Sequence, residues 1–368
     1  MDPRFVGRST PLDCGWPTGS PFRSAGADRQ GFGQIAEIES ELAALCADRH
    51  ADVSTRDTAR DMDVIRAVLG EERLSYLGIS YGTYLGAVYT QMFPGRADRI
   101  VLDSAVDPDG YGPRLLRDNG PPAAAALHDW AGWTAERHDE YRLGDTRGRV
   151  LDTVMGIYRA AIRQPLTVGE YRVDEHVLPV LLFAGLYDDR DEPSGELAAA
   201  VRVLRDAAAG RPATPTQALE EELRFVLTGE ESHYGSVQSA IICGDRAAPH
   251  DPQVYWREIQ AHRASGPLFE PFTRNLHVCA FWPNRPIEPP TRIGNGVPSL
   301  IVQSTGDPAT LYQHAQALHR ALTGSRLLTL AGARIHAVYA NYGSSCVDDQ
   351  VNAYLASGVP PARDGTCH

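Results

Sequence analysis

The stretch that decides the fold is RLSYLGISYGTYLG, residues 73–86. It begins with a short apolar run, 73–79, and continues into Gly-Ile-Ser-Tyr-Gly, in which Ser80 lies between two glycines. A second apolar segment, 83–93, follows and is closed by a proline. A short apolar run, a glycine-flanked bend and a longer apolar segment together predict a strand, a sharp turn and a helix.

The same alternation of strands and helices extends outward from this stretch, with one long interruption. Residues 57–69 have the periodicity of a helix that stops at a glycine. Further strands are expected at 99–102, 297–303 and 326–330. Helical stretches, such as 121–141, fill the region from about 111 to 238, where no strand is expected. The sequence therefore predicts an α/β protein whose three parts are a first piece of the core (1–110), a mostly helical cap (111–285) and a second piece of the core (286–368).

The composition argues against several classes of function. The chain has 368 residues and a net charge of −12, from 35 basic and 47 acidic residues, which would repel a nucleic-acid backbone. It contains no lysine, which excludes Schiff-base chemistry on the protein and a phosphate-binding P-loop. The longest apolar stretch, 177–186, includes Pro179 and is much shorter than the roughly 20 residues of a membrane helix. We therefore expect a globular protein with no membrane span.

Ser80 is the candidate nucleophile. In a nucleophile elbow the serine occupies a strained turn between a strand and a helix, and glycines at the positions of Gly78 and Gly82 avoid collisions between them. Gly-x-Ser-x-Gly also arises by chance in ordinary turns, but the strand before it and the helix after it favour the catalytic interpretation. The motif occurs once in this sequence.

Asp307 and His336 are the candidate partners of Ser80. A serine hydroxyl needs a histidine to accept its proton and a carboxylate to orient that histidine. Asp307 follows the expected strand 297–303, and His336 follows the expected strand 326–330, so each can lie on a loop at the carboxyl end of a strand. The chain order serine, aspartate, histidine is the one that this topology requires.

Each of these two assignments has an alternative. Asp307 precedes a proline and is also suited to start a turn, and Asp103, after the strand 99–102, is the rival acid. His314 and His319 are the rival bases, but they lie on a predicted helix that directs them away from a loop-built site.

The six cysteines favour disulfides over a metal site. They are Cys14, Cys46, Cys243, Cys279, Cys346 and Cys367, with no Cys-x-x-Cys pair. Sequential pairing is one of about 15 possible pairings, and buried free thiols are the alternative. Disulfides would place the protein in an oxidising compartment, although the chain shows no secretory signal sequence.

Three segments carry a resemblance to a known family. Residues 58–108, TARDMDVIRAVLGEERLSYLGISYGTYLGAVYTQMFPGRADRIVLDSAVDP, the acid loop at 305–310 and the ending SCVDDQVNAYLASGVPPARDGTC, 345–367, resemble the secreted tripeptidyl aminopeptidase-like α/β-hydrolases of actinobacteria. The resemblance covers nearly the whole chain and is loose only between about 111 and 238. It implies an α/β-hydrolase sheet with a helical cap and a catalytic triad of Ser80, Asp307 and His336. It also implies the pairs Cys14–Cys46, Cys243–Cys279 and Cys346–Cys367.

The sequence departs from the family pattern at two kinds of position. His336 lies between Ile335 and Ala337, where the family has glycine, and Phe5 stands where a glycine is usual. The segment 2–14 matches one that the family carries after its first strands, so those strands and a glycine-rich loop that supplies one oxyanion donor are expected to be missing. The backbone N–H of Tyr81 is the remaining identifiable donor, and the strand before Ser80 is expected to form an exposed sheet edge.

The resemblance also implies a substrate. A peptidase that recognises a free amino end needs negative charge, and Glu221, Glu222, Glu230, Glu231 and Asp245 lie where the cap rejoins the core. Of these, Asp245 is our candidate substrate contact, and the others are expected to be solvated surface charges. We expect release of short peptides from free amino ends, without a metal or other cofactor. An esterase or amidase acting on a small metabolite and a catalytically silent binding protein are the alternatives.

Overall fold

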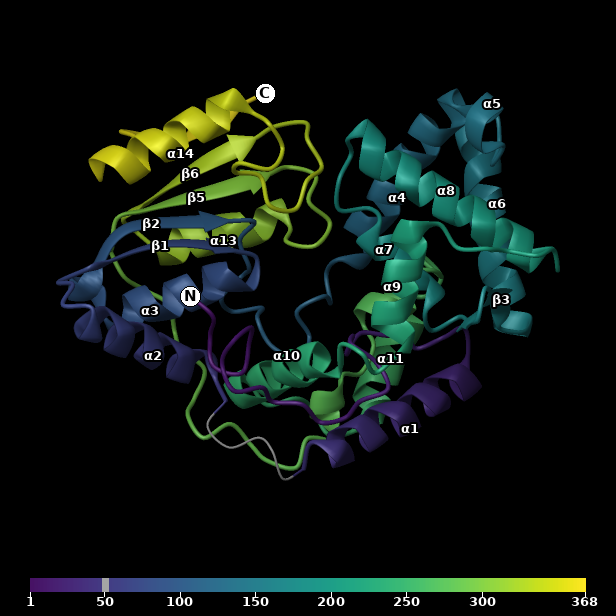
Figure 1. Cartoon of the computed structure of the whole chain (residues 1–368), viewed down its shortest axis with the longest axis horizontal. Helices are drawn as coiled ribbons and strands as arrows, with labels where there is room; N and C mark the ends of the chain where they lie inside the picture. Colours follow the sequence, from purple (N-terminus) through teal and green to yellow (C-terminus); the bar gives the residue numbers. More distant parts are fainter. Residues whose placement is uncertain (48–52) are drawn as a thin grey trace.

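The computed structural model describes residues 1–47 and 53–368. At its centre lies a parallel sheet with the strand order β1-β2-β5-β6-β7 (Figure 1). The five strands are β1 (Leu74–Ile79), β2 (Ala97–Asp103), β5 (Ser299–Ser304), β6 (Ser325–Leu330) and β7 (Gly365–Cys367). Because β2 pairs with β5, segments from before and after the helical region form one sheet. The predicted α/β class is confirmed.

Helices cover both faces of the middle of the sheet, as the nearly continuous apolar runs of β2 and β5 require. On one face, Val101 packs with α14 (Ser345–Ser357). On the other, Ile100 packs with residues of α3 (Tyr81–Met92) and α13 (Tyr312–Ala321). Successive residues of β2 therefore point to opposite helical layers, which is the alternation expected of a strand.

The β1 strand forms an edge of the sheet, because no other strand of the described residues pairs with its outer side. Leu77 and Ile79 of β1 remain 39% and 40% exposed. Next to α3 lies α2 (Thr55–Val68), whose outer face carries Val64 and Val68, 60% and 81% exposed. The exposed sheet edge expected from the sequence is therefore present, together with an uncovered apolar helix face.

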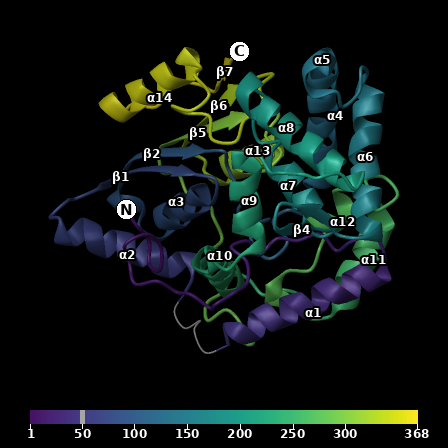
Figure 2. The same cartoon turned by 45° about the vertical axis from the view of Figure 1, so that its right-hand side comes forward.

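The helical region forms a second layer beside the sheet and has its own core (Figure 1). Its elements are α4 (Gly120–Glu136), α5 (His138–Tyr141), α6 (Arg147–Arg163), β3 (Leu166–Val168), β4 (Tyr171–Val173), α7 (Leu178–Ala184), α8 (Asp191–Ala208), α9 (Gln217–Leu227) and α12 (Glu270–Thr273). Between them in sequence, α10 (Ser232–Asp245) packs with α2 and α3, and α11 (Pro252–His262) packs with α1 (Arg29–Leu45). Short 3-10 turns occur at Pro94–Arg96 and Val278–Ala280. Figure 2 shows α1 beside α10 and α11, below both layers.

Three details differ from the sequence predictions. The helix expected at 121–141 is interrupted at Arg137, whose backbone leaves the helical region with φ −110° and ψ 32°. Strands β3 and β4 form a small hairpin inside the region where no strand was expected, with Gly169 at φ +56° in its turn. β7 lies in the terminal segment, outside the strands that the sequence predicted, and pairs with β6.

The described helices include none that is long and apolar enough to cross a membrane. The apolar stretch 177–186, which contains Pro179, is largely α7, and its residues are buried in the core of the helical region.

Candidate active site

Ser80 lies at the bend between β1 and α3 in a strained backbone conformation, with φ 56° and ψ −120°. Few residues other than glycine adopt a positive φ, and such strain is typical of a serine on a nucleophile elbow. A Cβ added at Gly78 would lie 2.4 Å from the carbonyl oxygen of Gly82. The first glycine of the motif is therefore required by the close approach of strand and helix.

Hydrogen bonds hold the bend on both sides. The hydroxyl of Thr83 donates to the carbonyl oxygen of Ser80 at 2.7 Å, and the hydroxyl of Tyr76 donates to the carbonyl oxygen of Gly82 at 2.8 Å. The backbone N–H of Ser80 donates to the carbonyl oxygen of Asp103 at 3.0 Å. These contacts fix the backbone from which the Ser80 side chain projects.

Asp307 and His336 lie within hydrogen-bonding distance of each other, 2.9 Å between Oδ2 and Nδ1. The Asp307 side chain is fully buried, and that of His336 is 16% exposed. Thr310 donates its hydroxyl to Oδ2 at 2.6 Å and its backbone N–H to Oδ1 at 3.1 Å, which fixes the carboxylate. Because Nδ1 faces Asp307, Nε2 is the ring nitrogen left to accept a proton.

The pKa of His336 is raised above its ordinary value of 6.5. Burial by itself lowers it, but the hydrogen bond that the imidazole donates to Asp307 and the charges of Asp307 and Asp103 outweigh burial. A histidine with a raised pKa is a stronger base, which suits the removal of a proton from a serine hydroxyl.

Asp103, the rival acid, has a different role. Its carboxylate accepts the backbone N–H groups of Val338 and Tyr339 at 2.9 and 2.7 Å, just beyond His336. The carbonyl oxygen of Asp103 accepts the backbone N–H of Ser80, so the bend and the histidine loop are both hydrogen-bonded to this one buried residue. The sequence placed Asp103 near the site but could not show that it binds the loop backbone.

The rival bases His314 and His319 lie on α13 and have other partners. His314 Nδ1 accepts the backbone N–H of Leu311, and His319 contacts Ser325 and Asp364.

Tyr187, in the connection between α7 and α8, is a contact that the sequence reasoning missed. Its carbonyl oxygen accepts the backbone N–H of His336 at 2.9 Å, and its ring lies 5.4 Å from the imidazole. Tyr187 belongs to the region where the resemblance is loose, and no motif marks it. It brings the helical region into contact with the histidine loop.

The candidate acidic residues are spread along the chain from α9 to the last residue of α10. The side chains of Glu221, Glu222, Glu230 and Glu231 are exposed. Asp245 is 7% exposed, and its two carboxylate oxygens accept the backbone N–H and the hydroxyl of Thr55. The geometry gives no support to the predicted substrate contact at Asp245, because both oxygens already have donors.

The cysteines are bonded as Cys14–Cys46, Cys243–Cys279 and Cys346–Cys367, the pairs that the resemblance implies. Cys243, Cys279 and the buried His277 bring three possible metal ligands together, but the two sulfurs are bonded to each other, so neither is a thiolate ligand.

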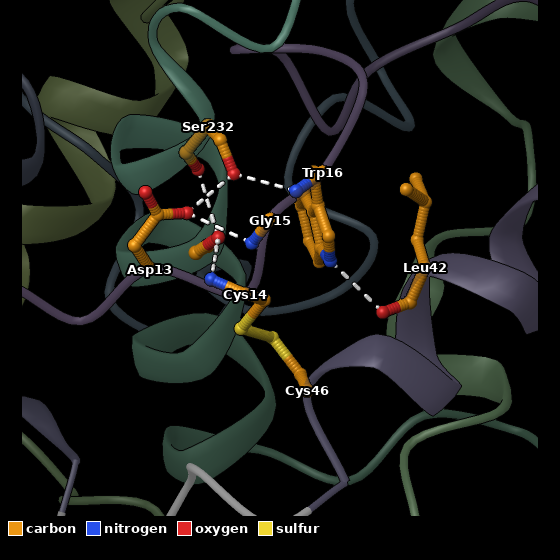
Figure 3. Close-up of a disulfide and its surroundings, with 8 residues drawn as sticks. Asp13, Cys14, Gly15, Trp16, Leu42, Cys46 and Ser232 are labelled. Atoms are coloured by element: carbon orange, nitrogen blue, oxygen red, sulfur yellow. Dashed lines mark hydrogen bonds between the residues drawn. A yellow bond between two sulfur atoms is a disulfide. The ribbon is translucent and has the colours of Figure 1, made fainter.

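The first disulfide joins the N-terminal segment to α1 (Figure 3). Beside the disulfide, the indole N–H of Trp16 donates to the carbonyl oxygen of Leu42 at 2.9 Å. The backbone N–H of Trp16 donates to the hydroxyl of Ser232 at 2.6 Å. The N-terminal segment is thus fastened to both α1 and α10.

A cavity of about 600 Å³ lies between α4 and the acid loop. Trp130, Asp307 and Leu311 are among its lining residues, whereas Ser80 and His336 are not. It therefore approaches the candidate site from the side of the acid rather than from the side of the nucleophile.

Comparison with known proteins gives relatives of the whole chain. A family model described as "TAP-like protein" matches residues 266–367. The tripeptidyl aminopeptidase of Streptomyces lividans is 33% identical over 384 residues, covering 100% of this chain and 69% of that protein. The serine protease Hip1 of Mycobacterium tuberculosis is 28% identical, covering 92% of this chain and 67% of that protein. A carboxylesterase B of Mycobacterium tuberculosis is 29% identical, covering 100% of this chain and 72% of that protein.

Proposed function

This chain belongs to the tripeptidyl aminopeptidase-like family of α/β-hydrolases, and on that premise we propose that it is a secreted serine hydrolase that releases short peptides from free amino ends. The observation that carries the proposal is the strained backbone of Ser80 next to a residue, Asp103, that also binds the loop of His336. The identity to the Streptomyces enzyme supports a peptide substrate. The three disulfides support an oxidising, extracellular location.

In the proposed reaction, Ser80 Oγ attacks the carbonyl carbon of the substrate while its proton passes to His336 Nε2. Asp307 holds the imidazole through Nδ1 and stabilises the imidazolium that forms. The proton then goes to the leaving amine, and water releases the acyl group from Ser80 by the reverse sequence. The backbone N–H of Tyr81 is the proposed donor to the oxyanion, and residues 111–285 form the proposed cap.

An esterase is the second candidate. A carboxylesterase of Mycobacterium tuberculosis is among the relatives. Activated esters need less stabilisation of the oxyanion in the transition state than amides do.

The test compares tripeptidyl and aminoacyl p-nitroanilides with p-nitrophenyl esters, each with a free or acetylated amino end. We expect the free tripeptidyl anilide to be cleaved by the wild type and not by Ser80→Ala. Ester turnover with untouched anilides would establish the esterase instead. Inactivity toward every substrate, in folded protein, would favour the binding protein.

A further inference from the structure

The side chain of Tyr81 ends in a chain of buried hydrogen bonds that leads away from the candidate site. Its hydroxyl lies 2.9 Å from Thr55 Oγ1, at the first turn of α2. Thr55 Oγ1 in turn donates to Asp245 Oδ2 at 2.5 Å, and the backbone N–H of Thr55 donates to Asp245 Oδ1 at 2.7 Å. Thr55 and Asp245 are 1% and 7% exposed.

The direction of this chain follows from the chemistry of its members. Burial raises the pKa of Asp245 to about 7, and above that pH its ionised carboxylate only accepts hydrogen bonds. The Thr55 hydroxyl then donates to Asp245 and has a lone pair left for the phenol. Tyr81 O–H then donates to Thr55. Each hydrogen bond of the chain orders the next, and water has little access to the contact between Thr55 and Asp245 because both residues are buried.

The far end of the chain is held firmly. Asp245 is two residues beyond Cys243, whose disulfide to Cys279 fixes the last turn of α10. A Cβ added at Gly244 would lie 2.1 Å from the carbonyl oxygen of Val53, so the segment before α2 is pressed against the end of α10. The chain therefore connects Tyr81 to a rigid, cross-linked part of the protein.

The near end is the residue that directly follows Ser80. The backbone N–H of Tyr81 is the proposed oxyanion donor, and it belongs to a bend held at a strained φ of 56° at Ser80. A strained bend relaxes unless surrounding contacts prevent it. We propose that Thr55 and Asp245 are positioning residues, which hold the Tyr81 backbone in place by binding its phenol. The expected change in kcat rests on the proposed function, whereas the expected positioning of the Tyr81 backbone does not.

The kinetic test uses four variants and the ester substrate. Thr55→Val removes the hydroxyl at almost constant volume, Thr55→Ser keeps it, and Tyr81→Phe removes the other end of the same bond. Thr134→Val is the matched control, because Thr134 is a buried threonine of α4 whose hydroxyl has no hydrogen-bond partner among the described residues. We expect Thr55→Val and Tyr81→Phe each to lower kcat about fivefold with little change in KM, and Thr55→Ser to restore most of the rate.

The double variant Thr55→Val/Tyr81→Phe separates positioning from general destabilisation. If Thr55 acts through the phenol, kcat of the double variant equals that of Tyr81→Phe alone, because the bond is already lost. Multiplied losses in the double variant, or a comparable loss in Thr134→Val, would overturn the proposal.

Hydrogen exchange at the Ser80 amide, which donates to the carbonyl oxygen of Asp103 at the same bend, tests the same inference without any activity. Exchange at this amide should be faster in Thr55→Val than in the wild type and unchanged in Thr55→Ser and Thr134→Val. Unchanged exchange in Thr55→Val would overturn the inference even in an active enzyme. An inactive wild type would overturn the proposed function and leave this measurement to decide the inference.

Discussion

The Nδ1 atom of His336 lies 2.9 Å from Oδ2 of Asp307, and this contact is shielded from solvent because the aspartate side chain is fully buried. A buried carboxylate next to an imidazole stabilises its protonated form more strongly than an exposed one. The pKa of His336 is raised for this reason, against the opposing effect of burial.

The pH dependence of activity should reflect the effect of Asp307 on the pKa of His336. His336 must be neutral to accept a proton, so kcat/KM should rise with pH through a midpoint above 6.5. Asp307→Asn removes the negative charge, so the midpoint should move to lower pH while kcat falls, by about 10⁴-fold at neutral pH. A pH–rate profile of both proteins checks this. A midpoint that stays in place or rises in the variant would show that Asp307 is not the partner.

The stability of the protein should fall as Glu39 ionises. This residue of α1 is 0% exposed, and its pKa is raised to about 8. Burial raises the pKa, and the opposite charge of Arg23 and the backbone N–H of Val278 only partly compensate. Because the folded state binds this proton more tightly than the unfolded state, its stabilising contribution is present below about pH 4.5 and lost as pH rises through about 8.

Glu39→Gln should therefore flatten the dependence of the free energy of unfolding on pH between 5 and 8. We expect the variant to be more stable than the wild type at pH 8 and similar at pH 5, in denaturant titrations at each pH. Glu41→Gln, an exposed change on the same helix, is the control. Parallel curves for wild type and Glu39→Gln would show that Glu39 titrates normally.

Ala337 has a left-handed backbone, with φ +69°, at a position where the family has glycine. An alanine in this region is strained, and glycine is not. Ala337→Gly should thus raise the free energy of unfolding by up to about 1 kcal/mol, offset in part by the greater freedom of glycine in the unfolded chain. Ala353→Gly, in the exposed middle of α14, should instead lower it by about 1 kcal/mol. Equal losses in both variants would contradict this explanation.

The outer face of α2 should promote self-association. Val64 and Val68 are one helical turn apart and largely exposed, and an uncovered apolar face attracts other apolar surfaces. Val68→Lys should reduce concentration-dependent association in sedimentation velocity. Ile287→Lys is matched to it, because Ile287 and Val68 are both 81% exposed. Association that is unaffected by Val68→Lys, or equally reduced by both changes, would rule out this face.

The parts of the fold that sequence could predict are those with a local physical cause. The bend at Ser80 follows from the steric need for Gly78, and the central strands follow from apolar runs of sufficient length. Strands β3, β4 and β7 have three residues each, too few for a periodic signal. The pairing of β7 also depends on β6, which is distant in sequence.

In the candidate site, too, the residues could be predicted from local sequence, but the contacts between distant segments could not. Asp307 and His336 could be named because each follows a recognisable strand. The contacts of Asp103 with Val338 and Tyr339, and of Tyr187 with His336, join segments far apart in the chain. Asp245 was chosen for its charge, but its binding of Thr55 could be seen only once α2 and α10 were placed side by side.

The most direct test of the central claim is covalent labelling with a fluorophosphonate, followed by mass spectrometry of the modified peptide. The probe reacts with a serine whose hydroxyl is activated by a neighbouring base. We predict a single adduct on Ser80, formed in the wild type, strongly slowed in His336→Ala and absent in Ser80→Ala. An adduct on another serine, or equal labelling of Ser80 in His336→Ala, would contradict the proposed pairing of this nucleophile with this base.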